Sequence, residues 1–155
     1  MIRGRVQESD HQMEGRPAVS SWKNVKPGHE KLWIWQKAAK LHQEIVRICE
    51  KLPRKERYRL IDQIQRSSKS VKDNIAEGNE SYYFEDKKKG LYTARKEAGE
   101  TQSHLRDFEM KGYLPAAVVQ DMIDEYEEIK RGINGLVRAI SAKKELSGKK
   151  GTKRK

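Results

Sequence analysis

The apolar positions of this chain recur at alternating intervals of three and four residues within four successive segments. Such spacing places the apolar side chains on one narrow stripe of a helix, which is typical of helices that pack against one another. In residues 58–78 the stripe consists of Ile61, Ile64, Ser68, Val71 and Ile75. Small serines in the middle of this segment would let a neighbouring helix approach closely and would bond to the preceding turn; they are Ser67, Ser68 and Ser70. Gly78 is predicted to end the helix in the left-handed conformation.

The same spacing predicts three more helices. The first covers residues 29–52 and stops at Pro53, with a stripe of Ile34, Ala38, Leu41, Ile45, Ile48 and Leu52. The next ends at Gly112 and has a stripe of Phe84, Leu91, Ala94, Ala98, Thr101, Leu105 and Phe108. The last opens at Pro115 and has a stripe of Val119, Met122, Tyr126, Ile129, Ile133, Leu136 and Ile140. No segment alternates as a strand would, so the expected fold is all-α, an antiparallel up-down four-helix bundle.

The 155 residues fit one domain with two appended segments. Residues 1–28 mix Gly, Pro, Ser and charge without periodicity and are expected to form a flexible arm, with Trp22 as its one anchor. Residues 29–142 form the predicted bundle, and residues 143–155 are expected to be a disordered basic tail. The single Cys49 is expected to be a buried apolar residue. The chain shows neither an apolar signal core nor a membrane-spanning run, which indicates a cytoplasmic location.

The charge favours a polyanionic partner. The chain has 34 Lys and Arg against 23 Asp and Glu, a net charge of +11, which speaks about association and not about fold. Residues 141–155 carry +6 and residues 1–28 carry +2, which leaves +3 for the bundle. Nucleic acid is the leading candidate, although more than half of the excess charge lies in the tail.

Four groups of residues are candidates for binding nucleic acid. The turn after the first helix carries Lys51, Arg54, Lys55, Arg57 and Arg59, the loop cations, with only Glu56 against them. On the third helix, Lys88, Arg95 and Arg106 return to nearly the same angle and, with Tyr92, form a helical ridge about 27 Å long. Arg66 and the tail residues Lys149, Lys150, Lys153, Arg154 and Lys155 complete the set. The alternative is that these runs are solvated faces. Tyr82 and Tyr83 could stack on bases or be buried at a loop or subunit contact.

The sequence argues against an enzyme. A carboxylate-bridged metal site in a four-helix bundle needs a Glu-x-x-His pair on each of two helices, and the only such spacing is Glu8 with His11, since Glu100 and His104 are four apart. No glycine-framed serine elbow or phosphate-binding loop occurs. Asn74, Glu77 and Glu100, the polar residues expected nearest the core, are interpreted as groups that cap helices and hold register. No catalytic residue, cofactor or metal is predicted.

Several short motifs resemble those of one protein family. They are Trp35, Gln36, Lys37 and Ala38; Pro53, Tyr58, Leu60 and Gln63; Ser70 and the run Asn74, Ile75, Ala76, Glu77, Gly78; and Ala94, Arg95, Glu100, Leu105, Gly112, Tyr113 and Leu114. Together they resemble the bacterial four-helix bundle proteins encoded by 23S rRNA intervening sequences, over roughly residues 32–140. This chain departs from the family at Lys72, often a proline, and at Lys96, often a glycine.

Members of that family resemble, in turn, the accessory protein of diversity-generating retroelements, a barrel-shaped homopentamer that binds RNA and DNA and works with a reverse transcriptase. The resemblance implies a ring-like homopentamer that binds RNA, with DNA as a second ligand, and has a reverse transcriptase as partner. The alternative is a ribosome- or rRNA-associated structural RNA-binding protein without that partner. Trp33 shares its helix face with Lys37, Lys40 and Glu44, where no core is expected, so we predict that it lies at a subunit contact.

Overall fold

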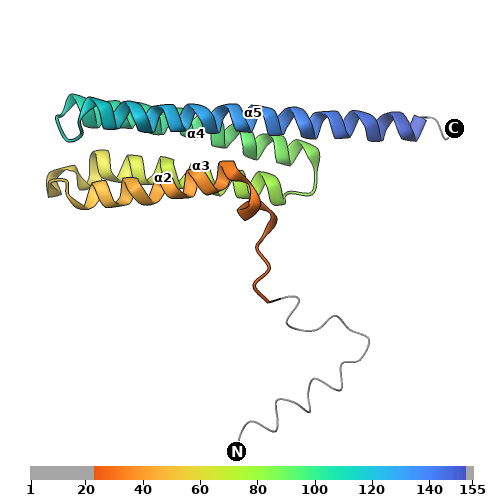
Figure 1. Ribbon diagram of the computed structural model, residues 1–155, viewed down its shortest axis with the longest axis horizontal. Coiled ribbons are helices and arrows are strands. Elements are labelled where there is room, and N and C mark those ends of the chain that lie inside the picture. The colour runs from red at the N-terminus through yellow and green to blue at the C-terminus, as the bar shows by residue number, and fades with distance from the viewer. Residues whose placement is uncertain (1–22, 153–155) are drawn as a thin grey trace, which may run out of the picture.

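The computed structural model describes residues 23–152, with side chains to residue 149. Within this part of the chain there are four long helices and no strand: α2 (Trp33–Glu50), α3 (Asp62–Glu80), α4 (Phe84–Met110) and α5 (Ala116–Thr152). A 3₁₀ turn, η2 (Gly28–Lys31), precedes α2, while η3 (Arg54–Glu56) and the π-helical turn η4 (Arg57–Ile61) join α2 to α3. Consecutive helices run in opposite directions (Figure 1), which confirms the predicted helical bundle.

The helices do not contact one another equally. α3 packs extensively on α4, α4 packs on α5, and α2 lies mainly against α3, with a smaller contact to α5. The α2–α3 and α4–α5 connections lie at one end of the bundle, and the α3–α4 connection lies at the other (Figure 1). The two ends therefore carry different loops, and this separates the candidate residues.

The core consists of the predicted stripes. Buried on both sides of the α3–α4 contact are Ile64, Val71, Ile75, Leu91, Ala94, Ala98, Leu105 and Phe108, and α2 and α5 add Ile34, Leu41, Ile45, Val119, Tyr126, Ile129 and Ile133. Ile48, Leu52, Ile61, Leu136 and Ile140 are only partly buried and pack around this core. Cys49 is buried as predicted, and burial raises the pKa of its thiol to about 11.

The prediction that Gly78 ends the second helix is wrong. α3 continues through Gly78 to Glu80, and a Cβ built on Gly90 of α4 would lie 2.8 Å from the Cα of Gly78. The two glycines therefore let the backbones of α3 and α4 approach closely. Gly112, in contrast, ends α4 as predicted, because its φ of +77° allows the Tyr113 N–H to reach the Phe108 carbonyl at 2.9 Å.

The C-terminal segment also differs from the prediction. Residues 143–152 were expected to be disordered, but they continue α5 to Thr152. No proline interrupts them, and Lys, Glu and Leu are good helix formers, although Gly148 and Gly151 are not. The side chains of residues 142–149 are exposed, and this α5 extension, residues 141–152, projects beyond the bundle (Figure 1). The prediction of a flexible arm concerns residues 1–22, Trp22 included, which lie outside the described residues. Residues 153–155 of the tail lie outside them as well.

Trp33 is not without a core contact. A Cβ built on Gly132 of α5 would lie 2.5 Å from Cζ2 of the Trp33 indole, so the ring packs against this glycine. The same side chain nevertheless remains 53% exposed. One side of the ring therefore packs on α5 and the other faces solvent.

Within residues 23–152, no helix combines the length and apolar character needed to cross a membrane.

Candidate nucleic-acid interface

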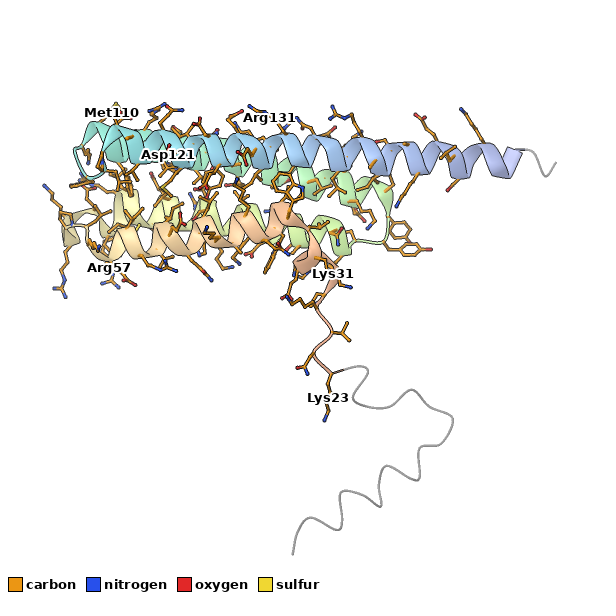
Figure 2. The ribbon with its side chains drawn as sticks, in the orientation of Figure 1. Lys23, Lys31, Arg57, Met110, Asp121 and Arg131 are labelled. Carbon is orange, nitrogen blue, oxygen red and sulfur yellow. The ribbon has the colours of Figure 1, made fainter. Side chains whose placement is uncertain are left out.

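The loop cations gather at one end of the bundle. Lys51 follows the last turn of α2, Arg54 and Lys55 belong to η3, and Arg57 and Arg59 belong to η4. All five side chains are exposed. Figure 2 shows Arg57 at this end, where Met110, the last residue of α4, also lies. Arg57 stacks on Tyr58, with 5.7 Å between its guanidinium carbon and the ring centroid.

Glu56, the acidic residue that lies between the loop cations in the sequence, points inward. Glu56 is only 3% exposed, and its Oε1 accepts hydrogen bonds from Lys111 Nζ at 3.0 Å and from the Tyr113 hydroxyl at 2.9 Å. Those bonds from Lys111 and Tyr113 hold the pKa of Glu56 below its usual value. Among the described residues, no carboxylate lies within ion-pair distance of any loop cation. The loop cations therefore keep their positive charge for an external anion.

The first half of the helical ridge also holds its cations without neutralising them. Lys88 Nζ lies 5.8 Å from the Tyr92 ring centroid, and the Arg95 guanidinium carbon lies 5.0 Å from it. Arg95 Nη1 also donates to the side-chain oxygen of Asn134 at 2.8 Å. An aromatic face and an amide orient a cation but carry no net charge. These two positive charges are fixed in position and remain available to a phosphate.

Arg106, the third cation of the ridge, is paired with an acid, unlike Lys88 and Arg95. Its Nη1 pairs with Glu109 Oε2 at 2.9 Å, and its Nη2 donates to Gln120 Oε1 at 2.6 Å. Arg66 is exposed on α3, where its charge acts on Glu97 of α4. The helical ridge thus divides into an open part near the start of α4 and a compensated part near its end.

The predicted residues do not form a single site. The loop cations and the start of α4 lie at opposite ends of α3, a helix of 19 residues, about 28 Å at 1.5 Å per residue. Lys149 is exposed on the α5 extension, at the same end as the start of α4 (Figure 1). The Lys150 side chain and Lys153, Arg154 and Lys155 lie outside the described residues. The structure therefore offers two basic ends.

An acidic groove, which the sequence analysis did not identify, runs between α2 and α5. It has a volume of about 690 Å³, and its acidic lining residues are Glu44, Asp121, Asp124, Glu125 and Glu128. Lys37 of α2 forms an ion pair with Glu128 across this contact. Because these carboxylates would repel phosphates, a nucleic acid is expected to avoid this face. The sequence signal for the groove was the acidic spacing at 121, 124, 125 and 128, which returns to one face of a helix.

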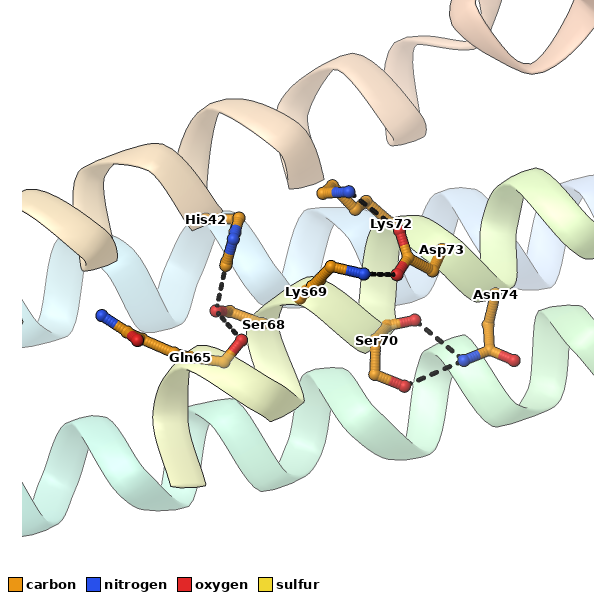
Figure 3. Close-up of polar contacts among 8 residues, drawn as sticks. All are labelled: His42, Gln65, Ser68, Lys69, Ser70, Lys72, Asp73 and Asn74. Carbon is orange, nitrogen blue, oxygen red and sulfur yellow. Dashed lines mark hydrogen bonds and ion pairs between the residues drawn. The ribbon is translucent and has the colours of Figure 1, made fainter. Parts of the chain in front are cut away.

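A histidine and a serine meet between α2 and α3, but they serve packing. His42 Nδ1 and Ser68 Oγ are 2.7 Å apart, and Ser68 Oγ also bonds to the Gln65 carbonyl at 3.2 Å (Figure 3). Ser68 is fully buried, so no substrate can reach its hydroxyl. Burial lowers the pKa of His42, as does the positive charge of Lys72. Nucleophilic catalysis would need an accessible hydroxyl, and this pair instead joins two helices.

The other polar candidates are Asn74 and Glu77 on α3 and Glu100 on α4. Asn74 Nδ2 donates to both the carbonyl and the hydroxyl of Ser70 at 2.9 Å (Figure 3). Glu77 and Glu100 are exposed, so the expectation that they lie near the core is wrong. No group of three potential metal ligands is close enough to hold an ion within the described part of the chain. Both bonds of Asn74 therefore lie within α3.

Comparisons with known proteins agree with this fold. A crystal structure of a protein with unknown function from the S23 ribosomal protein family of Bacteroides thetaiotaomicron VPI-5482 is similar, with a TM-score of 0.62 and 23% sequence identity. The match covers 68% of this chain and 95% of that one. No curated protein matches this chain.

The family assignment rests on the sequence profile. The profile of the 23S rRNA-intervening sequence protein family matches residues 30–135, which includes all of α2, α3 and α4 and the first half of α5. The matched range covers most of the bundle and confirms the resemblance read from the sequence. This chain therefore belongs to the 23S rRNA-intervening sequence protein family.

Proposed function

We propose that this protein is a non-enzymatic RNA-binding protein whose loop cations contact the RNA backbone. The observation that carries the proposal is the inward turn of Glu56, which leaves five exposed cations without a carboxylate partner among the described residues. The family is named after an intervening sequence of 23S rRNA, and we take RNA as the ligand for that reason, with DNA as a second ligand.

Binding of this kind follows from phosphate neutralisation. Each Lys or Arg that contacts a phosphate releases a condensed counterion. For a single strand, each such contact therefore lowers the affinity by about 0.7 log units for every tenfold increase in salt concentration. Contacts between cations and phosphates carry no sequence information, so little sequence preference is expected. The acidic groove between α2 and α5 keeps the RNA on the opposite faces.

The test compares two triple variants with the same change of charge. Arg54→Gln, Lys55→Gln and Arg57→Gln together remove three loop cations; Lys37→Gln, Lys69→Gln and Lys130→Gln remove three cations that are paired with Glu128, Asp73 and Glu127. The loop variant is expected to reduce the slope of log affinity against log salt by about 2. The paired variant is expected to change it little. Equal slopes for the two variants would rule out the loop cations as the binding site.

We also propose that the protein assembles as a ring-like homopentamer. The support is the family relationship together with Trp33, which is half exposed beside a hollow of about 330 Å³ lined by Gly132, Gly135 and Leu136. A neighbouring subunit that fills this hollow would cover the outer side of the indole. Light scattering at micromolar concentration is expected to give a multiple of 18.1 kDa. A monomer would reject both the ring and this role of Trp33.

The same RNA contacts serve either of two partners, and we propose the reverse transcriptase of a diversity-generating retroelement over a ribosome-associated role. Adding the protein to that enzyme and its template RNA is expected to increase complementary DNA synthesis, and the loop variant is expected to lose the effect. Co-sedimentation with ribosomal particles, without any effect on DNA synthesis, would favour the rRNA-associated role. A reverse-transcriptase gene and a template repeat beside this gene would support the first partner independently.

A further inference from the structure

Two tyrosines are largely exposed to solvent at the end of the bundle opposite the loop cations. Tyr82 is 89% exposed and Tyr83 is 69% exposed, in the tyrosine loop, residues 81–83, that joins α3 to α4. Their rings are 5.1 Å apart and meet edge to face at 88°. Burial within the loop is therefore wrong, while stacking on bases and burial at a subunit contact both stay predictions. Exposed aromatic rings on a loop are costly to keep in water and are often functional.

A groove lies beside these rings. It has a volume of about 500 Å³, within the roughly 300–1,000 Å³ typical of small-ligand sites. Tyr82, Phe84, Leu136 and Ile140 supply its apolar lining, and Lys143 and Lys144 supply positive charge. Figure 1 shows α5 passing the tyrosine loop before it continues beyond the bundle. The α5 extension therefore forms one wall of the groove, a role that a disordered tail could not fill.

Cations alternate with aromatic rings from this groove along the start of α4. Lys144 Nζ lies 4.2 Å from the Phe84 ring centroid, and Lys88 Nζ lies between that ring, at 6.0 Å, and Tyr92, at 5.8 Å. Arg95 follows on the far side of Tyr92. The rings hold the cations in a fixed row without cancelling their charge.

The acidic residues at this end of the bundle neutralise its cations only in part. Lys144 is 3.5 Å from Glu85, but both side chains are largely exposed, so this pair is weak and a phosphate can replace the carboxylate. Lys87 is committed to the Asn79 carbonyl at 2.8 Å, and Glu80 to His29 at 3.0 Å. Lys88 and Lys143 have no ion-pair partner among the described residues. Positive charge therefore remains beside the exposed rings.

We infer that this end binds an unpaired, single-stranded segment of RNA, with bases stacked on Tyr82 and Tyr83 and phosphates along Lys144, Lys88 and Arg95. The inference rests on the RNA binding proposed above and adds a second contact region that selects for strand state. Base faces are accessible only when the strand is unpaired, whereas a duplex offers its backbone and groove edges. Stacking platforms beside a basic row are typical of proteins that bind single strands without sequence preference.

The test uses the full-length protein with two fluorescently labelled RNA probes, a short oligoadenylate and a duplex of equal length. The variant Tyr82→Ala with Tyr83→Ala is expected to weaken oligoadenylate binding by roughly 5- to 150-fold per stacked base and to leave duplex binding unchanged. The matched control, Tyr82→Phe with Tyr83→Phe, keeps both rings and is expected to bind as the original protein does. Since both side chains are exposed, neither variant should lower the melting temperature, which circular dichroism checks.

The outcomes separate this inference from the proposed function. Loss of duplex and oligoadenylate binding in the loop variant, with selective loss of oligoadenylate binding in the alanine variant, supports both. Unchanged oligoadenylate affinity in the alanine variant, or an equal loss on both probes, overturns the inference and leaves the role of the loop cations standing. If the original protein binds neither probe, both proposals fail. A single-stranded DNA of the same sequence shows whether the 2′-hydroxyl contributes.

Discussion

At the scale of single residues, one buried carboxylate determines the character of a whole loop. Glu56 faces Lys111 and Tyr113, which come from the far end of α4 and the loop after it. Glu56→Gln keeps the size of the side chain but removes the charge that pairs with Lys111. A lower melting temperature is therefore expected for this variant, because a neutral amide oxygen accepts weaker hydrogen bonds from Lys111 and Tyr113 than the buried carboxylate does. An unchanged melting temperature would mean that the pair contributes nothing to stability.

His42 makes stability depend on pH in a direction that follows from its surroundings. Burial and the nearby Lys72 and Lys69 lower its pKa below the ordinary value of 6.5, although Asp73 opposes them. The unfolded chain therefore binds a proton more readily than the folded one, and stability falls as pH drops from the unfolded pKa through the folded pKa. Thermal melts between pH 7.5 and 5 are expected to show a steeper loss for the original protein than for His42→Gln. Parallel curves would contradict this assignment.

Residue-level predictability differed between the core and the polar contacts. The buried positions followed from spacing alone, because a stripe such as Ile64, Val71 and Ile75 has one way to face a core. The partners of Glu56 could not be predicted in the same way, since Lys111 and Tyr113 are 55 and 57 residues away. Local sequence contains no information on which distant groups a loop carboxylate will meet.

At the scale of elements, the contact between α3 and α4 depends on glycine. A Cβ at Gly90 would lie 2.8 Å from Gly78 Cα, and neither backbone can move aside without separating the helices. Gly90→Ala should therefore cost about 1–3 kcal/mol in overpacking, which outweighs the gain of about 1 kcal/mol in helix propensity. Gly99→Ala on the same helix is the control, because its Cβ would meet only the end of Lys130 at 3.8 Å. Chemical denaturation should show the first variant destabilised and the second unchanged or stabilised.

Helix existence was predictable, and helix ends were less so. Gly78 and Gly112 are the same residue at the end of an apolar stripe, yet only Gly112 adopts a positive φ. The difference arises from tertiary packing, since Gly78 is held in α3 by its contact with α4. The α5 extension was missed because it has no apolar face and therefore no tertiary contact that would predict a helix. It is helical nevertheless, since it only has to extend a helix that has already formed.

At the scale of the whole molecule, folding sorts the charge that the sequence shows only as a sum. The predicted bundle carries a net charge of just +3. Folding places acids along the α2–α5 groove and leaves cations at both ends. The candidate cations could be listed from the sequence, but their separation into two ends could not be predicted from it. The separation of the two ends depends on how the helices are arranged, whereas Glu109, the ion-pair partner of Arg106, is only three residues away on α4.

The α5 extension allows the contributions of charge and helix to be separated. Deleting residues 147–155 removes five cations, namely Lys149, Lys150, Lys153, Arg154 and Lys155. The melting temperature should not change, because the described side chains from residue 142 onward are exposed. The slope of log affinity for single-stranded RNA against log salt should fall by up to about 3.5, or about 0.7 for each cation that contacts a phosphate.

A second variant, with Gln at the same five positions, keeps the length of the chain. It should lose the same salt dependence and retain the helical circular dichroism signal that the deletion loses. If the deletion leaves that signal per molecule unchanged, residues 147–152 are not helical in solution. If instead the Gln variant binds RNA with the original salt slope, the tail cations make no phosphate contacts. The electrostatic contribution would then come from the remaining cations, those of the bundle and those of residues 1–28.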